Sequence, residues 1–137
     1  TFIASTRRVL PAGLLLLGGW AMAQSYPDKP IECFVPYPAG GGTDVLARTL
    51  AEAMSKTLGQ PIVINNKPGA ATNIGAAYVA GAKADGYTIL SADTATLAAN
   101  PFFYRKPGYS AEKSFAPIGL TVRFPLVLSG NPNVPGD

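Results

Sequence analysis

The stretch IECFVPYPAGGGTDV, residues 31–45, decides the fold of this chain of 137 residues. Its apolar run, residues 31–35, predicts a strand, and the two prolines that follow prevent the ladder of hydrogen bonds from continuing. Three glycines then permit backbone angles that other residues avoid. A helix is expected to begin directly afterwards, with Thr43 or Gly42 as its cap and Asp44 near its positive end. This order is typical of a β-α unit.

The helix of this first unit is predicted to run as far as Gly59, which stops it. Apolar residues recur along it with a spacing of four, and we expect this stripe to pack on a sheet: Leu46, Leu50, Met54 and Leu58. The charged residues fall on a different face: Arg48, Glu52 and Lys56.

A second unit repeats the scheme. The β-branched run 62–64 predicts a buried strand, followed by the polar loop 65–71. Thr72 or Asn73 is expected to cap a helix over about residues 74–84, which is mostly Ala and Gly and therefore able to approach the sheet closely.

A third unit begins with a predicted strand at residues 87–90. The loop 91–96 follows, rich in residues that cap helices, and then a short helical stretch that Asn100-Pro101 should close. Three consecutive units of this kind predict an α/β fold with a parallel-rich sheet flanked by helices.

The sequence beyond Pro101 is less regular. The aromatic run 102–104 favours a core or domain contact over a ligand platform, and residues 110–113 suit one helical turn. Short strands are predicted at 117–121 and 126–128. Turn-forming residues end the chain, as if a connection to further structure followed.

Composition removes several classes of function. The chain has no His and a single Cys, Cys33, which excludes a Cys/His zinc site, a Ser-His-Asp triad, a Cys-His pair and an internal disulfide within it. The apolar fraction of 47% is enough to build a core. Cys33 is expected to be buried and unreactive. No catalytic residue, metal site or cofactor is predicted.

The first 23 residues are predicted to be a secretory signal peptide. Arg7 and Arg8 precede an apolar run that ends in Ala21-Met22-Ala23, and cleavage is expected after Ala23. The run is short against the roughly 20 residues of a membrane-spanning helix. Without the two arginines the net charge falls from +3 to +1, and the other basic residues are scattered, so nucleic acid is not an expected partner.

Three polar loops follow the three predicted strands, at residues 36–44, 65–73 and 91–96. Because the carboxyl ends of parallel strands meet at one edge of a sheet, the loops are expected to line a ligand crevice. Bare peptide groups ahead of a helix N-terminus suit an anion, and those are expected at Ala39, Gly40, Gly41 and Gly42. The loops add hydrogen-bonding side chains at Thr43, Thr72, Asn73, Ser91, Thr94 and Thr96. No nucleophile-base pair accompanies them, which favours recognition over reaction.

Two carboxylates and one ring in these loops have alternative interpretations. Asp44 and Asp93 each begin a helix after a strand, as an acid/base pair could, but a capping or dipole interaction is the favoured interpretation. Tyr37 is compatible either with stacking on a ligand or with plugging the end of the sheet. The sequence contains no P-loop run, and the G-x-G-x-x-G dinucleotide motif that would start at Gly40 fails because position 45 is Val.

A series of short motifs resembles the N-terminal part of a Bug-family solute-binding protein, the extracytoplasmic receptor of a tripartite tricarboxylate transporter. In combination the motifs are specific, and they occur in order over about residues 26–135: Tyr26-Pro27-Asp28-Lys29-Pro30-Ile31, Val35-Pro36-Tyr37-Pro38-Ala39-Gly40-Gly41, Thr43-Asp44, Asn66-Lys67-Pro68-Gly69-Ala70, Asn73-Ile74-Gly75-Ala76, Asp85-Gly86-Tyr87-Thr88 and Phe115-Ala116-Pro117-Ile118.

The resemblance implies a fold like that of the type II periplasmic binding proteins, with two lobes around a ligand. Residues 24–137 would be a partial first lobe, cut near the crossover to the second. Further implications are a periplasmic location, a small organic carboxylate ligand, membrane permease subunits as partners, no enzymatic activity and a monomer at full length. The implied ligand-binding residues are Tyr37, Ala39, Gly40, Gly41, Gly42, Thr43, Asp44, Ala71, Thr72, Asn73, Ser91, Asp93, Thr94 and Thr96.

The sequence departs from the family pattern in two loops. Glycine pairs are common in the family where this chain has Ala71-Thr72, and Gly-Thr-Ser-Gly-Thr-like sequences where it has residues 92–96. If Asp93 faces the cleft, it favours a ligand with an ammonium or amide group, such as an amino acid, over a simple dicarboxylate. If Asp93 caps the helix, it carries no information about the ligand.

Two other classes of protein compete with a binding receptor. A secreted α/β enzyme could take its catalytic groups from a missing C-terminal part, although the failed dinucleotide motif disfavours a dehydrogenase. A structural or adhesive module ranks third, because Gly and Thr concentrate at strand ends, where a cleft belongs.

Overall fold

The computed structural model describes residues 25–125. Its elements are, in order, β1 (Ile31–Val35), α1 (Gly42–Leu58), β2 (Ile62–Asn66), α2 (Asn73–Ala80), β3 (Thr88–Leu90), the π-helix η1 (Ala95–Ala99) and α3 (Asn100–Phe103). The predicted sequence of three β-α units is confirmed. The predicted signal peptide and the predicted strand at residues 126–128 lie outside the described residues.

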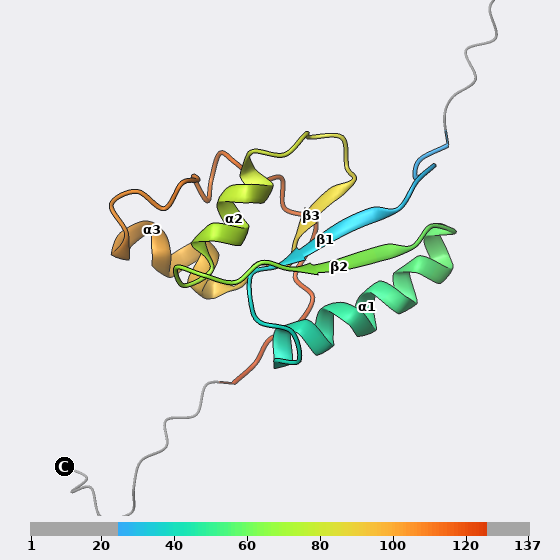
Figure 1. Ribbon diagram of the computed structural model, residues 1–137, viewed down its shortest axis with the longest axis horizontal. Helices are drawn as coiled ribbons and strands as arrows, with labels where there is room; N and C mark the ends of the chain where they lie inside the picture. The colour runs from blue at the N-terminus through green and yellow to red at the C-terminus, as the bar shows by residue number, and fades with distance from the viewer. Residues whose placement is uncertain (1–24, 126–137) are drawn as a thin grey trace, which may run out of the picture.

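The three strands form a parallel sheet in the order β2-β1-β3. In the central strand, Cys33 is aligned with Ile64 on one side and Ile89 on the other. The chain passes from β1 to β2 and then crosses to β3 on the far side of β1. Two crossovers in opposite directions place α1 and α2 on opposite faces of the sheet (Figure 1). The reversal between β1 and β3 is a topological switch point.

Strand β1 supplies most of the buried apolar residues. Ile31, Cys33, Phe34 and Val35 are at most 7% exposed, as the sequence predicts for Cys33. Burial raises the pKa of the Cys33 thiol to about 11, which keeps it protonated and unreactive. The predicted burial of residues 62–64 is wrong, because β2 is an edge strand of the described sheet and Val63 is 44% exposed.

Helix α1 buries small residues more fully than the predicted apolar stripe. Ala47 and Ala51 are buried, the three leucines of the stripe are half-buried, and Met54 is 42% exposed. The most buried face follows the spacing of residues 44, 47 and 51, and alanines let the helix lie close to the strands. The N-cap position is Gly41, not Thr43 or Gly42, and no side chain caps the helix.

Helix α2 covers the other face with an even closer approach. A Cβ atom at Gly75 would lie 2.8 Å from the carbonyl oxygen of Lys67 and 2.9 Å from Cβ of Pro36. The ring of Tyr78 packs on that of Phe34 at 4.7 Å between centroids. The helix ends at Ala80, earlier than the predicted residue 84, and Gly81 follows it.

The segment after β3 differs from prediction at two places. The helical stretch does not close at Asn100-Pro101 but continues through α3 to Phe103. Pro101 is tolerated because it stands in the first turn of α3, where a missing N–H leaves little unsatisfied. Phe102 and Phe103 are 89% and 81% exposed, so the aromatic run is not part of the described core.

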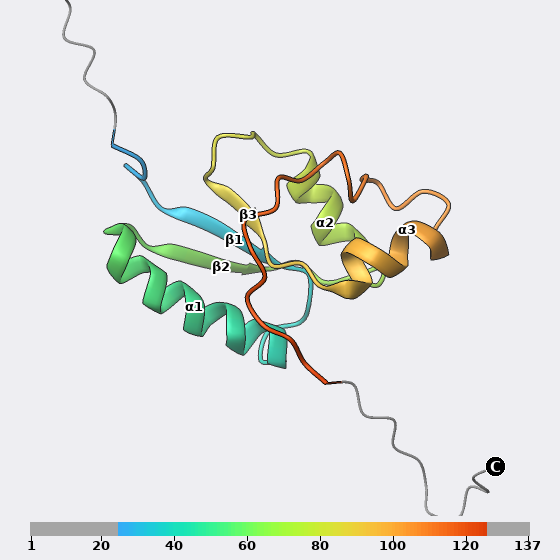
Figure 2. The ribbon, with the colours of Figure 1, turned by 180° about the vertical axis from the view of Figure 1, so that it is seen from behind.

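The last described residues carry little regular structure. The predicted turn at residues 110–113 is confirmed, since the Ser114 N–H donates to the carbonyl oxygen of Ser110 at 2.9 Å. The strand predicted at 117–121 is wrong, because these residues pair with no strand of the described sheet. The chain instead passes the sheet as an irregular segment, drawn in red, toward the end of the molecule where α1 begins (Figure 2).

Candidate functional site

The carboxyl ends of the three strands bring together the three loops that the sequence singles out. The loop after β1 and the loop after β3 flank the topological switch point, where open parallel sheets bind their ligands. The loop after β2 joins them through hydrogen bonds described below. The candidate site therefore consists of residues 36–44, 67–73 and 91–96.

The first loop is an exposed, side-chain-poor backbone in front of α1. Residues 39–42 are exposed, and a Cβ atom at Gly40 or Gly42 would meet no other atom within 4 Å. Gly40 has a φ of +85°, which a glycine adopts without strain. Because no side chain caps α1, the N–H groups of its first turn point toward this open side. The arrangement suits a carboxylate oxygen.

The side chain of Asp44 fixes the position of this loop. Its carboxylate is buried, and it accepts hydrogen bonds from the Gly40 N–H at 2.8 Å, from Nε of Arg48 at 3.0 Å and from Nδ2 of Asn66 at 2.8 Å. Asn66 also donates to the carbonyl oxygen of Tyr37 at 3.1 Å. The Arg48 guanidinium compensates the negative charge of Asp44, so this carboxylate does not repel an anion from the loop.

The second loop is held in an unusual conformation. Ala70, Ala71 and Thr72 have φ values of 45°, 49° and 80°, in the left-handed region that glycine prefers. Such strain persists only where surrounding contacts enforce it. Thr72 occupies the N-cap position of α2 but makes no capping bond, so the predicted cap is wrong.

The contacts that enforce this conformation come from the segment after β3. Nδ2 of the buried Asn100 donates to the carbonyl oxygen of Ala71, to Oγ1 of Thr72 at 3.1 Å and to Oδ1 of Asn73 at 2.9 Å. Oγ1 of Thr96, which is fully buried, lies 2.9 Å from Oγ1 of Thr72. The second and third loops are thus joined by a buried polar network.

Tyr109 completes this network, and sequence reasoning missed it. Its hydroxyl donates to the carbonyl oxygen of Thr96 at 2.6 Å and lies 3.1 Å from Oδ1 of Asn73. Tyr109 is remote from all three strand ends in sequence, and the Pro107-Gly108 pair before it signals a turn but not a contact with the site. No spacing rule links such a residue to the site.

Asp93 begins the helical segment of the third loop as a cap. Its Oδ1 accepts hydrogen bonds from the Thr96 N–H at 3.0 Å and from Oγ1 of Thr96 at 2.9 Å. Its Oδ2 accepts one from the hydroxyl of Tyr37. The capping interpretation of Asp93 is confirmed, and no acid/base pairing with Asp44 is needed to explain either carboxylate.

The predicted site residues thus fall into two groups. The side chains of one group are buried and committed to internal hydrogen bonds: Asp44, Thr72, Asn73 and Thr96. The other group is exposed or half-buried, and within it Tyr37 and Asp93 hydrogen-bond to each other: Tyr37, Ala39, Gly40, Gly41, Gly42, Thr43, Ala71, Ser91, Asp93 and Thr94.

The two carboxylates give the site a defined response to acid. Hydrogen bonds from Arg48, Gly40 and Asn66 hold the pKa of Asp44 well below its ordinary value. Partial burial works in the opposite direction at Asp93, but hydrogen bonds from Tyr37 and Thr96 lower its pKa as well. Both groups therefore bind protons more readily in the unfolded chain.

We expect the free energy of unfolding to be insensitive to these groups above about pH 5 and to fall as the pH drops below about 4. The reason is that a carboxyl with a lowered folded-state pKa stabilises the fold only while it is ionised. Urea unfolding between pH 2.5 and 7 measures this dependence. In Asp44→Asn the decline should be shallower, and an unchanged decline would show that Asp44 does not contribute.

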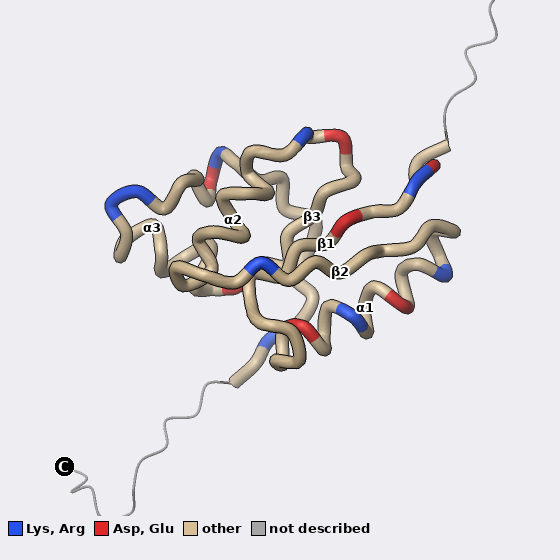
Figure 3. The backbone as a smooth tube through the Cα atoms, in the orientation of Figure 1, with Lys and Arg blue, Asp and Glu red and all other residues tan. Residues whose placement is uncertain are grey.

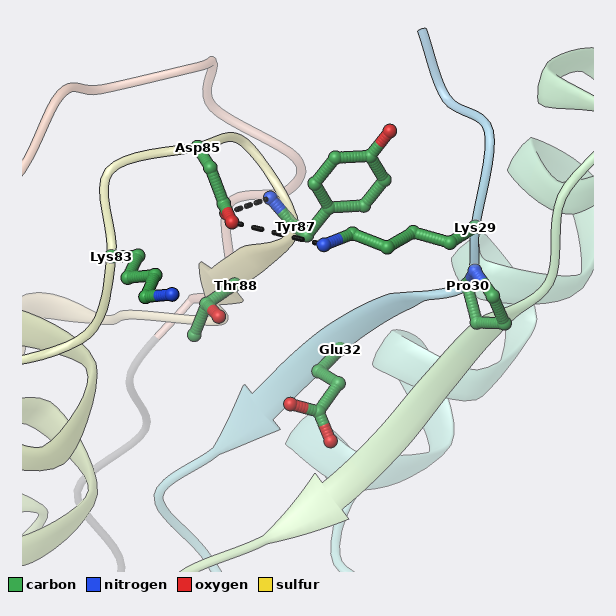
Figure 4. Close-up of a pocket in the computed structure, with 7 residues that line it drawn as sticks. All are labelled: Lys29, Pro30, Glu32, Lys83, Asp85, Tyr87 and Thr88. Atoms are coloured by element: carbon green, nitrogen blue, oxygen red, sulfur yellow. Dashed lines mark hydrogen bonds and ion pairs between the residues drawn. The ribbon is translucent and has the colours of Figure 1, made fainter.

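A hollow of about 290 Å³ lies away from the three loops, near the opposite end of the strands (Figure 4). Its lining combines both signs of charge: Lys29, Pro30, Glu32, Lys83, Asp85, Tyr87 and Thr88. Nζ of Lys29 lies 3.9 Å from the Asp85 carboxylate and 4.2 Å from the centre of the Tyr87 ring. These contacts anchor the start of the described chain to β3 and do not involve the three loops.

Charge is mixed along the rest of the described chain, where Lys and Arg are interspersed with Asp and Glu (Figure 3). Between residues 25 and 125 there is no group of three or more His, Cys, Asp and Glu side chains placed to hold a metal ion. Within the same range no helix has the length and apolar character needed to cross a membrane.

Residues 46–137 match the family model described as "Tripartite tricarboxylate transporter family receptor". BugT of Bordetella pertussis is 41% identical over 113 residues, which are 82% of this chain and 35% of that protein. The chain therefore spans about a third of the length of this relative.

Two solved structures are similar in sequence and shape. The periplasmic binding protein BugD is 44% identical with a TM-score of 0.63, covering 69% of this chain and 31% of its own. MatC of Rhodopseudomonas palustris, solved with bound malate, is 38% identical with a TM-score of 0.68, covering 70% of this chain and 33% of its own. These similarities confirm the expected α/β fold class of the periplasmic binding proteins.

Proposed function

This chain belongs to the tripartite tricarboxylate transporter family of receptors, and on that premise we propose that it captures a small organic carboxylate outside the cytoplasm for delivery to a transporter. One observation carries the proposal most directly. The exposed glycine backbone of residues 40–42 stands before the uncapped N-terminus of α1, at the switch point of the sheet. The ligand's carboxylate would be bound there by peptide N–H groups and ordered water.

We propose a binding role rather than a catalytic one. Asp44, Thr72 and Thr96 are buried and hydrogen-bonded to other residues of the chain, which leaves them no free proton acceptor or nucleophile for chemistry. The same bonds make the loops rigid before a ligand arrives, and such preorganisation increases affinity. We propose that this chain is exported to the periplasm, which its similarity to the periplasmic binding protein BugD supports, and that it is cleaved after Ala23. Its proposed partners are membrane permease subunits, with the receptor itself monomeric.

The proposal is tested by a thermal-shift screen of the gene's complete mature product against dicarboxylates, tricarboxylates, aromatic carboxylates and amino acids. A ligand at 100 times its dissociation constant adds about 2.7 kcal/mol to the free energy of unfolding, which such a screen resolves. We expect a clear shift with at least one carboxylate. A folded protein that shifts with none of them would contradict the proposal.

A matched pair of variants locates the site in the same screen. Gly42→Asp introduces a carboxylate where the ligand's carboxylate should sit, and it is compatible with folding because acidic residues stabilise a helix N-terminus. We expect it to weaken binding at least tenfold without lowering the melting temperature of the free protein. Ala53→Asp adds the same charge at an exposed position farther along α1 and should bind as the wild type does.

A further inference from the structure

Tyr37 and Asp93 meet across the switch point of the sheet. Tyr37 follows β1 and Asp93 follows β3, and the hydroxyl of Tyr37 donates a hydrogen bond to Oδ2 of Asp93. The carbonyl oxygen of Tyr37 also accepts a hydrogen bond from Asn66 at the end of β2. Tyr37 therefore touches the ends of all three strands at the place where a ligand would bind.

Both carboxylate oxygens of Asp93 already have partners within the chain. Oδ1 accepts from the N–H and the hydroxyl of Thr96, and Oδ2 accepts from Tyr37. Three donors and the positive end of the following helical segment stabilise the negative charge where it stands. A ligand ammonium is not required to balance it.

We propose that the hydrogen bond between Tyr37 and Asp93 is a latch that fixes the first ligand loop against the third, and that Asp93 acts as a positioning residue rather than as a selector for ammonium-bearing ligands. Without the latch, hydrogen bonds to Asp44 and Asn66 still hold the loop that follows Tyr37. The peptide groups of residues 40–42 are then positioned less precisely for a ligand. The effect on binding rests on the proposed function, whereas the effect on the free loop does not.

Three variants separate the latch from the charge. Asp93→Ser removes the latch and the negative charge. It keeps a helix-capping side chain, since serine caps helices as well as aspartate does. Asp93→Asn removes the charge and keeps the cap, and its amide can still hydrogen-bond to the oxygen of Tyr37. Tyr37→Phe removes the latch and keeps the charge. All three preserve the cap and the ring, so each should fold.

Binding is measured by calorimetry on the gene's complete mature product, with succinate and L-aspartate as probes that differ only by an ammonium group. A latch predicts that Tyr37→Phe and Asp93→Ser each weaken whichever probe binds by about tenfold, the loss of one charge-assisted hydrogen bond. Asp93→Asn should recover most of that loss, and the ratio of the two affinities should stay constant. If both Asp93 variants instead bind succinate more tightly and aspartate less tightly, with Tyr37→Phe unchanged, Asp93 is a selector and the latch is refuted.

Hydrogen exchange on the free protein provides a readout that needs no ligand. The latch predicts faster exchange at the amide of Gly40, whose N–H is hydrogen-bonded to Asp44, in Tyr37→Phe and Asp93→Ser, with the amides of β1 unchanged. Equal exchange in all variants would overturn the inference even if carboxylates bind. Faster exchange without binding of any carboxylate would support the latch and refute the proposed function.

Discussion

Gly75→Ala is expected to destabilise the fold by about 2–3 kcal/mol, although the change adds only one methyl group. The new Cβ would lie 2.8 Å from the carbonyl oxygen of Lys67, 2.9 Å from Cβ of Pro36 and 3.2 Å from its Cα. Two of these three atoms belong to the backbone, so no side-chain rotation can relieve the overlap. Helix α2 has to move away from the sheet.

The displacement should also damage the proposed site. Pro36 begins the first ligand loop, Lys67 belongs to the second, and the first turn of α2 carries Asn73. A shift of α2 therefore moves the first and second ligand loops apart. We expect affinity for the carboxylate found in the screen to fall by at least tenfold, in addition to the lower melting temperature.

Gly81→Ala is the matched control at the other end of the same helix. Gly81 has a φ of −91°, which alanine adopts freely, and a Cβ there would lie no closer than 3.7 Å to another atom. This variant should be neutral or slightly stabilising, because alanine reduces the conformational freedom of the unfolded chain. Urea unfolding of both variants gives the comparison, and equal stabilities would show that α2 can shift without penalty.

Local patterns predicted the framework because each pattern acts over a few residues. The first β-α unit was predicted from the apolar run 31–35, the prolines after it and the glycines before α1. Two repeats of this pattern predicted the parallel sheet. The convergence of the three loops followed from strand direction alone. Burial of Cys33 followed from its place in that first run.

Features that depend on contacts distant in sequence could not be predicted in this way. The choice of Ala47 and Ala51 over leucines as the most buried positions of α1 depends on how closely the sheet approaches. The partners of Thr96, Asn100 and Tyr109 are set by folding together segments far apart in the sequence. The expected cap Thr72 failed because its hydroxyl is bonded to Thr96 and Asn100 instead. Thr43 is not a cap because α1 begins one residue before it.

Asn100→Leu tests whether the buried network holds the left-handed turn of the second loop. Leucine has the same number and branching of side-chain heavy atoms as asparagine but no amide, so the carbonyl oxygen of Ala71 loses its donor in a buried place. We expect a loss of about 2–3 kcal/mol in the free energy of unfolding, the usual cost of an unsatisfied buried acceptor together with the lost bonds. Urea unfolding at pH 7 measures it.

Asn100→Asp should lower the free energy of unfolding further at pH 7, because an ionised carboxylate would face two oxygen atoms that only accept hydrogen bonds, the carbonyl oxygen of Ala71 and Oδ1 of Asn73. Burial and these neighbours raise the pKa of the introduced carboxyl. Its protonated form can donate one hydrogen bond, so this variant should regain part of its stability between about pH 7 and pH 5, where the wild type changes little.

Asn65→Leu is the control for both substitutions, because Asn65 also donates through its amide, to Glu32 at 3.2 Å, but does so at the exposed edge of the sheet. This substitution should lower the free energy of unfolding by no more than about 0.5 kcal/mol. If Asn100→Leu is as mild as this control, the left-handed conformation of residues 70–72 is maintained by the loop itself. If it is as costly as expected, the second loop depends on the segment after β3, and the three ligand loops form one cooperative unit that a ligand meets already assembled.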